Sequence, residues 1–322
     1  MIFKNNYIHE LELNFSNSCG AKCIMCSEPH GCDGESIMSR ETFDVLKKQL
    51  KDVKCDIIQS SGDGETFHNP NYLDFIEELK QIKPDTPIWI YNNFSEFTQE
   101  RIDRVLANNY FEKIHTRIDS LIPWIFEKSS NLNFETVIEN IKYFLSQNNR
   151  IPFVVLYNRI TDYYDRCEQV TGKRPIRDRF TDFELAQVPD EMKDITNFLK
   201  SHAKNPDLIA MCKISHGLWG ERYRNDIEHN SHWPCPKANV IEKVCWVYPN
   251  GKIGMCCYED RQNPEWALGD IRKQHILDIF YGEKRMDTLK KIKNLQNVNP
   301  FYNYPCNNPR MCGFNDGVEA KP

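Results

Sequence analysis

The sequence lacks the features that would assign the chain to a membrane, a secretory route or a nucleic acid. It has no apolar run long enough to span a bilayer. Its first residues, 1–6, do not contain the apolar core of a secretory signal. The net charge is −5, and there is no block of like charges and no basic stripe, which argues against nucleic-acid binding as the main activity. We therefore expect a cytoplasmic protein that does not bind membranes.

Cysteine is scarce in the middle of the chain but not at its two ends. Of the 13 cysteines, only Cys55, Cys167 and Cys212 lie between the first 32 and the last 90 residues. In a reducing compartment, groups of cysteines indicate metal binding rather than disulfides. The distribution therefore predicts two metal-binding regions, one at each end of the chain.

Strand-like and helix-like segments alternate over the first 200 of the 322 residues. Strands are predicted over residues 11–15, 57–58, 87–91, 113–120, 153–157 and 183–188. Helices are predicted to begin near Ser39, Asn69, Thr98, Asn133, Thr161 and Pro189. Six such βα units favour an α/β fold with parallel strands.

Two of these strands alternate between polar and apolar residues. Glu10, Glu12 and Asn14 are interleaved with Leu11 and Leu13, and the strand at 113–120 behaves in the same way. A polar face suits an open barrel around a wetted cavity. A closed sheet with solvated strand ends is the alternative.

The first group of cysteines forms a C-x3-C-x2-C pattern directly after the first predicted strand. Its members are Cys19, Cys23 and Cys26. Three thiolates on one loop can hold three corners of a cubane iron–sulfur cluster and leave the fourth iron open to a small molecule. A zinc knuckle, or three unrelated buried cysteines, is the alternative reading.

A glycine-rich turn follows the second predicted strand. It contains Gly62, Asp63, Gly64 and Glu65 in a G-x-G-E pattern. Glycines allow backbone carbonyls to approach a ligand closely, and such carbonyls can accept hydrogen bonds from an ammonium group. Alone, this turn would be read as an ordinary loop.

Together the two motifs resemble the signatures of the radical S-adenosylmethionine (SAM) enzymes. The resemblance implies a partial (βα)6 TIM-type barrel in which Cys19, Cys23 and Cys26 hold a [4Fe–4S] cluster that binds SAM. It also implies that the reduced cluster cleaves SAM to methionine and a 5′-deoxyadenosyl radical, which takes hydrogen from a substrate. The G-x-G-E turn would bind the amino group of SAM, although Thr66 stands where the family commonly has proline.

The resemblance also suggests further contacts with SAM and substrate. By position on the fourth and fifth strands, Arg117, Asp119 and Asn158 are candidates for binding SAM, and Met25 is a candidate for contact with adenine. Asp119 could equally be a helix cap or a structural acceptor, and Met25 could be a core residue. Glu12 and Arg117 are expected to line the cavity and are the candidate catalytic residues; a structural Glu–Arg pair is the alternative.

The last ninety residues resemble the auxiliary-cluster extensions called SPASM and twitch domains. A β-hairpin is predicted around the turn at Gly251, a C-x15-G-x4-C element surrounds it, and one helix is predicted over 275–294. The resemblance implies a second [4Fe–4S] cluster held by Cys235, Cys256, Cys306 and Cys312. Cys245 or Cys257 could replace one of these four, and structural zinc is the alternative metal.

These observations predict a radical SAM core over residues 1–202, an irregular bridge or lid over 203–234, and a small cysteine-rich α+β auxiliary domain over 235–322. The predicted activity is hydrogen abstraction leading to oxidation, crosslinking or epimerisation. The substrate would be a peptide, a protein side chain or a small polar molecule. Because the cysteine loop begins at residue 19, no leader-peptide domain is expected ahead of it. An electron donor such as flavodoxin or ferredoxin is implied, and a non-catalytic zinc module with two cysteine sites is the alternative function.

Overall fold

The computed structural model of the chain describes residues 6–26, 37–60, 64–175, 177–213, 241–255 and 267–293. The chain divides into two compact units, each built from separate parts of the sequence. The first unit draws on residues 1–19, 31–91 and 230–307, and the second on residues 20–30, 92–229 and 308–322.

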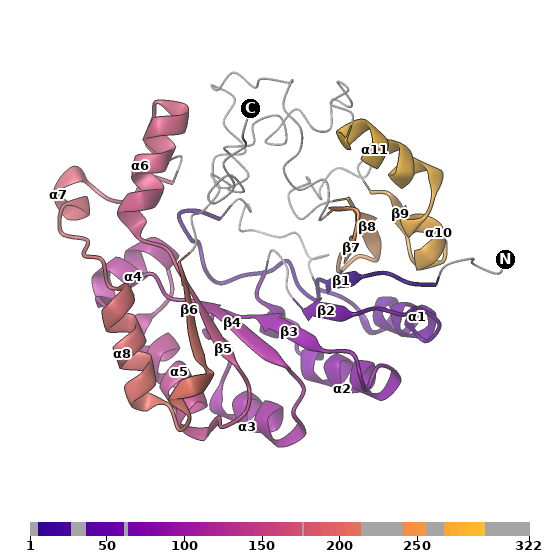
Figure 1. Cartoon of the computed structure of the whole chain (residues 1–322), viewed down its shortest axis with the longest axis horizontal. Helices are drawn as coiled ribbons and strands as arrows, with labels where there is room; N and C mark the ends of the chain where they lie inside the picture. The colour runs from indigo at the N-terminus through magenta and orange to yellow at the C-terminus, as the bar shows by residue number, and fades with distance from the viewer. Residues whose placement is uncertain are drawn as a thin grey trace. The chain divides into compact units, whose positions relative to one another are not determined.

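The first unit combines the beginning of the chain with its C-terminal region (Figure 1). Its elements are β1 (Glu10–Leu13), α1 (Arg40–Leu50), β2 (Ile57–Ser60), a 3-10 turn (Thr66–His68), α2 (Tyr72–Ile82), β3 (Ile88–Tyr91), β7 (Val244–Val247), β8 (Lys252–Gly254), β9 (Gly269–Asp270), α10 (Ile276–Phe280) and α11 (Glu283–Lys293). The strands β3, β2, β1 and β7 are neighbours in that order and are all parallel. The short strands β8 and β9 continue from β7 in antiparallel pairing.

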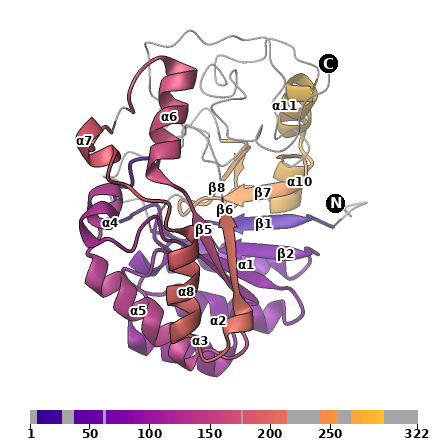
Figure 2. The ribbon, with the colours of Figure 1, turned by 60° about the vertical axis from the view of Figure 1, so that its left-hand side comes forward.

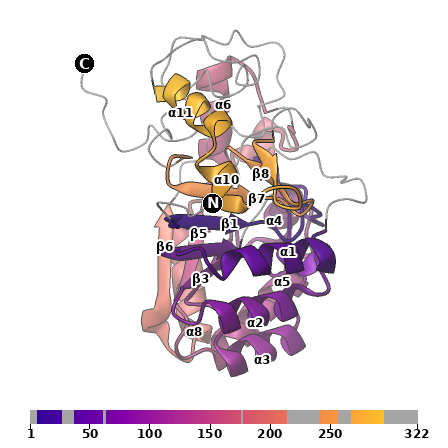
Figure 3. The ribbon, with the colours of Figure 1, turned by 90° about the vertical axis from the view of Figure 1, so that its right-hand side faces the viewer.

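Helices α1 and α2 lie side by side and pack on one face of β1 to β3 (Figure 3). Leu11 and Leu13 point to that face and are fully buried, whereas Glu10 and Glu12 on the other face remain partly accessible. Helix α1 begins where predicted, because the Ser39 side chain accepts a hydrogen bond from the Thr42 backbone N–H. The alternation of β1 therefore separates an apolar, helix-covered face from a polar one.

The C-terminal hairpin extends the strands of the first unit. Gly251 adopts a φ of 77° in the turn between β7 and β8, a conformation that glycine reaches without a steric penalty. Strand β7 pairs in parallel with β1, so that Glu12 faces Trp246. The predicted hairpin is confirmed, and its first strand is hydrogen-bonded directly to the strand that leads into the cysteine loop.

The second unit contains the remaining strands and most of the helices (Figure 2). Its elements are α3 (Gln99–Asn108), β4 (Lys113–Arg117), α4 (Pro123–Ser130), α5 (Phe134–Gln147), β5 (Phe153–Tyr157), α6 (Ile160–Thr171), α7 (Asp182–Leu185), α8 (Met192–His202), a 3-10 turn (Pro206–Leu208) and β6 (Ile209–Lys213). Strands β4, β5 and β6 are parallel neighbours. Helix α8 packs against both α5 and β6. The predicted α/β class with parallel strands is confirmed.

Three local predictions were wrong. Residues 183–188, predicted as the sixth strand, contain helix α7, because Thr181 and Glu184 form a capping box that starts a helix there. The sixth strand is β6, within residues predicted to be an irregular bridge. The single helix predicted over 275–294 is two helices, α10 and α11, with Tyr281 and Gly282 between them. In addition, helix α4 was not predicted at all.

Candidate functional site

Residues 20–26 of the cysteine loop belong to the second unit and form no helix or strand, and hydrogen bonds within that unit hold them. The backbone N–H groups of Lys22 and Ile24 donate to the carbonyls of Ser130 (2.7 Å) and Ser129 (2.9 Å), at the end of α4. The Cys26 N–H donates to the Cys23 carbonyl at 3.2 Å and closes a tight turn. The loop is therefore shaped by α4, the helix that the sequence did not predict.

An arginine that was not predicted also holds this loop. Arg177 lies between α6 and α7, and its Nη1 donates to the carbonyls of Cys23 (3.1 Å) and Cys26 (2.5 Å). A lone arginine in an irregular stretch carries no signal in the sequence, since the contact joins residues about 150 positions apart. Arg177 is a functional candidate that only the structure identifies.

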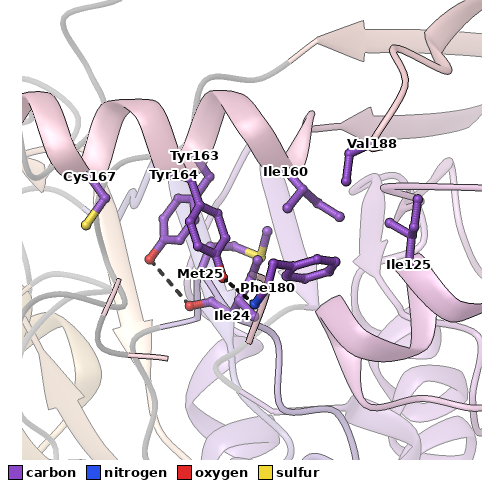
Figure 4. Close-up of a cluster of buried hydrophobic side chains, with 9 residues drawn as sticks. All are labelled: Ile24, Met25, Ile125, Ile160, Tyr163, Tyr164, Cys167, Phe180 and Val188. Carbon is purple, nitrogen blue, oxygen red and sulfur yellow. Dashed lines mark hydrogen bonds between the residues drawn. The ribbon is translucent and has the colours of Figure 1, made fainter. Parts of the chain in front are cut away.

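Hydrophobic packing fixes the middle of the loop (Figure 4). Ile24 and Met25 are buried among Ile125, Ile160, Tyr163, Tyr164, Cys167, Phe180 and Val188. The Tyr163 hydroxyl donates to the Ile24 carbonyl at 3.4 Å. Met25 is 1% exposed, which favours a core role for it. Its contact with adenine stays a prediction.

The three loop cysteines are reduced thiols of intermediate burial. Burial raises the pKa of the Cys23 thiol, and the positive charge of Arg117 acts against this shift, as Arg179 and Arg177 do more weakly. Within the described part of the chain, no three His, Cys, Asp or Glu side chains are already gathered as a metal site. The fit to a cluster therefore rests on the donor set, which is three free thiols on one short stretch of chain, with cationic groups acting on Cys23.

The described half of the G-x-G-E turn packs on the backbone that precedes the cysteine loop. A Cβ atom added to Gly64 would meet the Ser16 carbonyl oxygen and the Asn17 carbonyl carbon at 2.5 Å. The Glu65 N–H donates to the Ser18 carbonyl at 2.8 Å. The Glu65 side chain is buried and caps the following 3-10 turn by accepting from the Phe67 N–H. Gly62 and Asp63 lie outside the described residues.

Polar side chains meet at the ends of β4 and β5 in the second unit. Arg117 Nε donates to Asp119 at 2.7 Å, and Asp119 also accepts from the Asn158 backbone N–H. Burial alone would lower the pKa of Arg117, but the neighbouring charges of Asp119 and Cys23 raise it. The structure thus brings all three predicted residues together and gives Asp119 the acceptor role.

Two donors of this group have no hydrogen-bond partner within the described residues. They are Arg117 Nη2 and Asn158 Nδ2, and both atoms are buried. Buried donors are normally satisfied in folded proteins. These two therefore suit the oxygen atoms of a bound ligand.

Glu12 is bound by the C-terminal hairpin. Trp246 Nε1 donates to Glu12 Oε2 at 2.6 Å, and the two residues face each other across β1 and β7. Because Arg117 forms its ion pair with Asp119, each of the two candidate catalytic residues has a partner within its own unit. Their placement in one cavity stays a prediction.

The predicted auxiliary ligands Cys235, Cys256, Cys306 and Cys312 lie outside the described residues, as does Cys257. Cys245 is described and lies buried in β7. Burial raises the pKa of its thiol to about 12, with Arg285 acting in the opposite direction. A thiol in this setting behaves as a core residue, which argues against Cys245 as a replacement ligand.

Comparisons with known proteins agree with this arrangement. The SPASM family model, an iron–sulfur cluster-binding domain, matches residues 235–312. Streptococcus suis SuiB is 14% identical, with a TM-score of 0.55 over 89% of this chain and 68% of that one. A histidine-tagged form of anSMEcpe with bound AdoMet is 13% identical, with a TM-score of 0.55 over 88% and 83% of the two chains. Both are radical SAM enzymes. No curated sequence matches the chain.

The chain has the radical SAM fold and a SPASM extension. The predicted partial (βα)6 barrel is thereby confirmed as the fold type. The SPASM match covers residues 235–312, and the predicted domain boundaries stay a prediction. In this radical SAM fold the cysteine loop follows β1, and the G-x-G-E turn follows β2. Of the described residues, no helix has the length and apolar character needed to cross a membrane.

Proposed function

We propose that the chain is a radical SAM enzyme that reductively cleaves SAM and abstracts hydrogen from a substrate. The observation that carries this proposal is the C-x3-C-x2-C loop on a radical SAM fold. Its three cysteines are free thiols. Hydrogen bonds to the end of α4 and to Arg177 hold the part of the loop from Lys22 to Cys26. When bound by Cys19, Cys23 and Cys26, a [4Fe–4S] cluster would supply the electron that breaks a carbon–sulfur bond of SAM.

The chain's own residues would hold SAM beside this loop. Arg117 Nη2 and Asn158 Nδ2 are buried donors that suit the carboxylate and hydroxyl oxygens of SAM. Asp119 orients Arg117 through its Nε atom. The G-x-G-E turn, seated on the backbone of residues 16–18, would present carbonyls to the amino group. Glu12 and Arg117 are proposed to line the substrate cavity.

For the substrate, we propose a peptide, a protein side chain or a small polar molecule. Two structural relatives support the peptide class: SuiB is known bound to precursor peptide SuiA, with a TM-score of 0.54, and anSMEcpe bound to Kp18Cys peptide, with a TM-score of 0.51. Oxidation, crosslinking and epimerisation all begin with the same hydrogen abstraction. A flavodoxin or ferredoxin would provide the electron.

The SPASM extension is proposed to hold an auxiliary [4Fe–4S] cluster through Cys235, Cys256, Cys306 and Cys312. All four fall within the matched residues 235–312. Such a cluster could accept an electron from a substrate radical or bind substrate directly. The competing function is a zinc module without catalysis, and metal analysis separates the two: iron with sulfide supports the enzyme, and zinc alone supports the module.

The decisive experiment tests SAM cleavage. Anaerobically reconstituted protein given dithionite and SAM is expected to release 5′-deoxyadenosine, measured by chromatography. Replacing Cys19, Cys23 and Cys26 together with alanine should abolish this release, because no ligands for the first cluster remain. Cleavage retained in that variant would contradict the proposal, and Cys55→Ala is the matched control that should leave cleavage intact.

A further inference from the structure

Arg177 contacts two of the three proposed cluster ligands through their backbone. One guanidinium nitrogen, Nη1, donates to the carbonyls of both Cys23 and Cys26, at 3.1 and 2.5 Å. These residues are also joined by the Cys26 N–H bond to the Cys23 carbonyl. Arg177 thus bridges the carbonyl oxygens of the first and last residues of this turn. A metal bound by the thiols would not use these oxygens.

The segment that carries Arg177 is itself held in place. The Tyr164 hydroxyl accepts from the backbone N–H groups of Arg179 (3.0 Å) and Phe180 (3.2 Å) and donates to Asp178 (3.1 Å). Phe180 is buried in the same cluster as Ile24 and Met25 (Figure 4). These contacts order the segment around Arg177 without a bound metal. The entropy cost of placing the Arg177 side chain against the loop is therefore lower.

The guanidinium also places a positive charge next to the loop. A guanidinium group carries a positive charge, and a cluster gains negative charge when it is reduced. Charge and hydrogen bonding around an iron–sulfur cluster are among the factors that set its reduction potential. A fixed cation hydrogen-bonded to this loop favours the reduced form.

We propose that Arg177 is a positioning residue for the first cluster: it holds the Cys23–Cys26 turn in the shape that ligates iron, and its charge makes the cluster easier to reduce. This inference rests on the proposed function. It predicts two separable effects, one on how firmly iron is held and one on the reduction potential.

The test compares Arg177→Gln and Arg177→Lys with the wild type in the full, reconstituted chain. Iron loss to EDTA is followed by absorbance, and the midpoint potential by redox titration with electron paramagnetic resonance. Arg177→Gln is expected to lose iron from the first cluster several-fold faster and to shift its potential to more negative values. Arg177→Lys keeps the charge but not the planar guanidinium, so it should lose iron faster while its potential stays near that of the wild type.

Arg150→Gln is the matched control, because it removes the same charge at an exposed arginine whose side chain donates to the Leu106 carbonyl and not to the loop. It should leave both iron retention and potential unchanged. If Arg150→Gln reproduces the losses, the effects are not specific to Arg177 and the proposal is wrong. Unchanged iron retention and potential in Arg177→Gln would also overturn it. A wild type that takes no iron on Cys19, Cys23 and Cys26 would instead refute the proposed function.

Discussion

At the scale of single residues, the polar group at the ends of β4 and β5 shows what a strand pattern can predict. The family resemblance, applied to positions on the fourth and fifth strands, singled out Arg117, Asp119 and Asn158; the structure places them near one another, and their role in binding SAM stays a prediction. Their hydrogen bonds required coordinates, since nothing in the sequence says that Asp119 accepts from Arg117 Nε. Arg177 could not be predicted, because its partners are loop carbonyls with no side-chain signature.

The first residue-scale prediction concerns Arg117→Lys. Lysine keeps the charge but loses both the Nε bond to Asp119 and the spare Nη2 donor. SAM affinity is expected to fall about tenfold, equivalent to about 1.4 kcal/mol, measured by anaerobic titration of SAM. A large drop in melting temperature with unaltered SAM affinity would instead assign Arg117 a structural role.

A second residue-scale prediction concerns the buried histidine of β4. Burial, assisted by Lys113, lowers the pKa of His115 to about 4, compared with about 6.5 in an unfolded chain. Between these two values the unfolded chain binds more protons, so the stability that neutral His115 contributes is present above about pH 6.5 and is lost as the pH falls toward 4. The loss should be roughly 1 kcal/mol between pH 7.5 and pH 5.5.

Urea unfolding at these two pH values measures this effect. In His115→Gln, the decrease in the free energy of unfolding between pH 7.5 and pH 5.5 should be smaller by roughly 1 kcal/mol, because glutamine does not titrate. An equal pH dependence in wild type and His115→Gln would contradict the prediction.

At the scale of elements, most helices and strands follow from periodicity and capping. Ser39 and Asn133 both accept the capping hydrogen bond that their position predicts. The two strand errors have different physical causes. In β6 only Ile209 is buried, so this strand carries no apolar alternation. Phe183, Glu184 and Leu185 alternate only briefly, and the local capping box of Thr181 and Glu184 makes a helix there, with Phe183 78% exposed.

The element-scale prediction contrasts two glycines. Gly64→Ala would force a Cβ to within 2.5–2.6 Å of the backbone of residues 16–18, and either the turn or the start of the cysteine loop must move. We expect a loss of stability of about 2–3 kcal/mol together with weaker SAM binding. Urea unfolding and SAM titration measure the two effects.

Gly172→Ala is the comparison variant. Gly172 has a φ of 69° but has nothing within 4 Å of its added Cβ, so only the backbone strain of about 1–2 kcal/mol is expected, with no effect on SAM binding. Equal losses of stability and of SAM affinity in the two variants would show that close packing at Gly64 is unimportant.

At the scale of the whole molecule, the class of fold and the presence of a SPASM extension both followed from cysteine spacing and the alternation of strands and helices. The two compact units did not. The predicted boundaries at residues 202 and 235 follow the order of the sequence, whereas the first unit combines residues 31–91 with residues 230–307. Pairing between distant strands has no local signal, so this arrangement needed the structure.

The whole-molecule prediction concerns iron content. Two cubane clusters require about eight irons and eight sulfides per chain, measured by chemical analysis after anaerobic reconstitution. The variant with alanine at Cys19, Cys23 and Cys26 should retain about half, because the SPASM cysteines hold their own cluster. A folded variant that loses all its iron would show that the extension binds no independent cluster.

The pairing of β1 with β7 also has a consequence for how the protein is made. The strand at residues 10–13 leaves the ribosome long before its neighbour at residues 244–247. At about 5–20 residues per second the interval is roughly ten to fifty seconds, and during it one edge of β1 lacks its β7 partner. Unpaired edges promote aggregation, and charged side chains along them oppose it. Glu10 and Glu12 supply that charge on β1, so we expect the same carboxylates to oppose aggregation of the nascent chain before Glu12 accepts its hydrogen bond from Trp246 in the folded one.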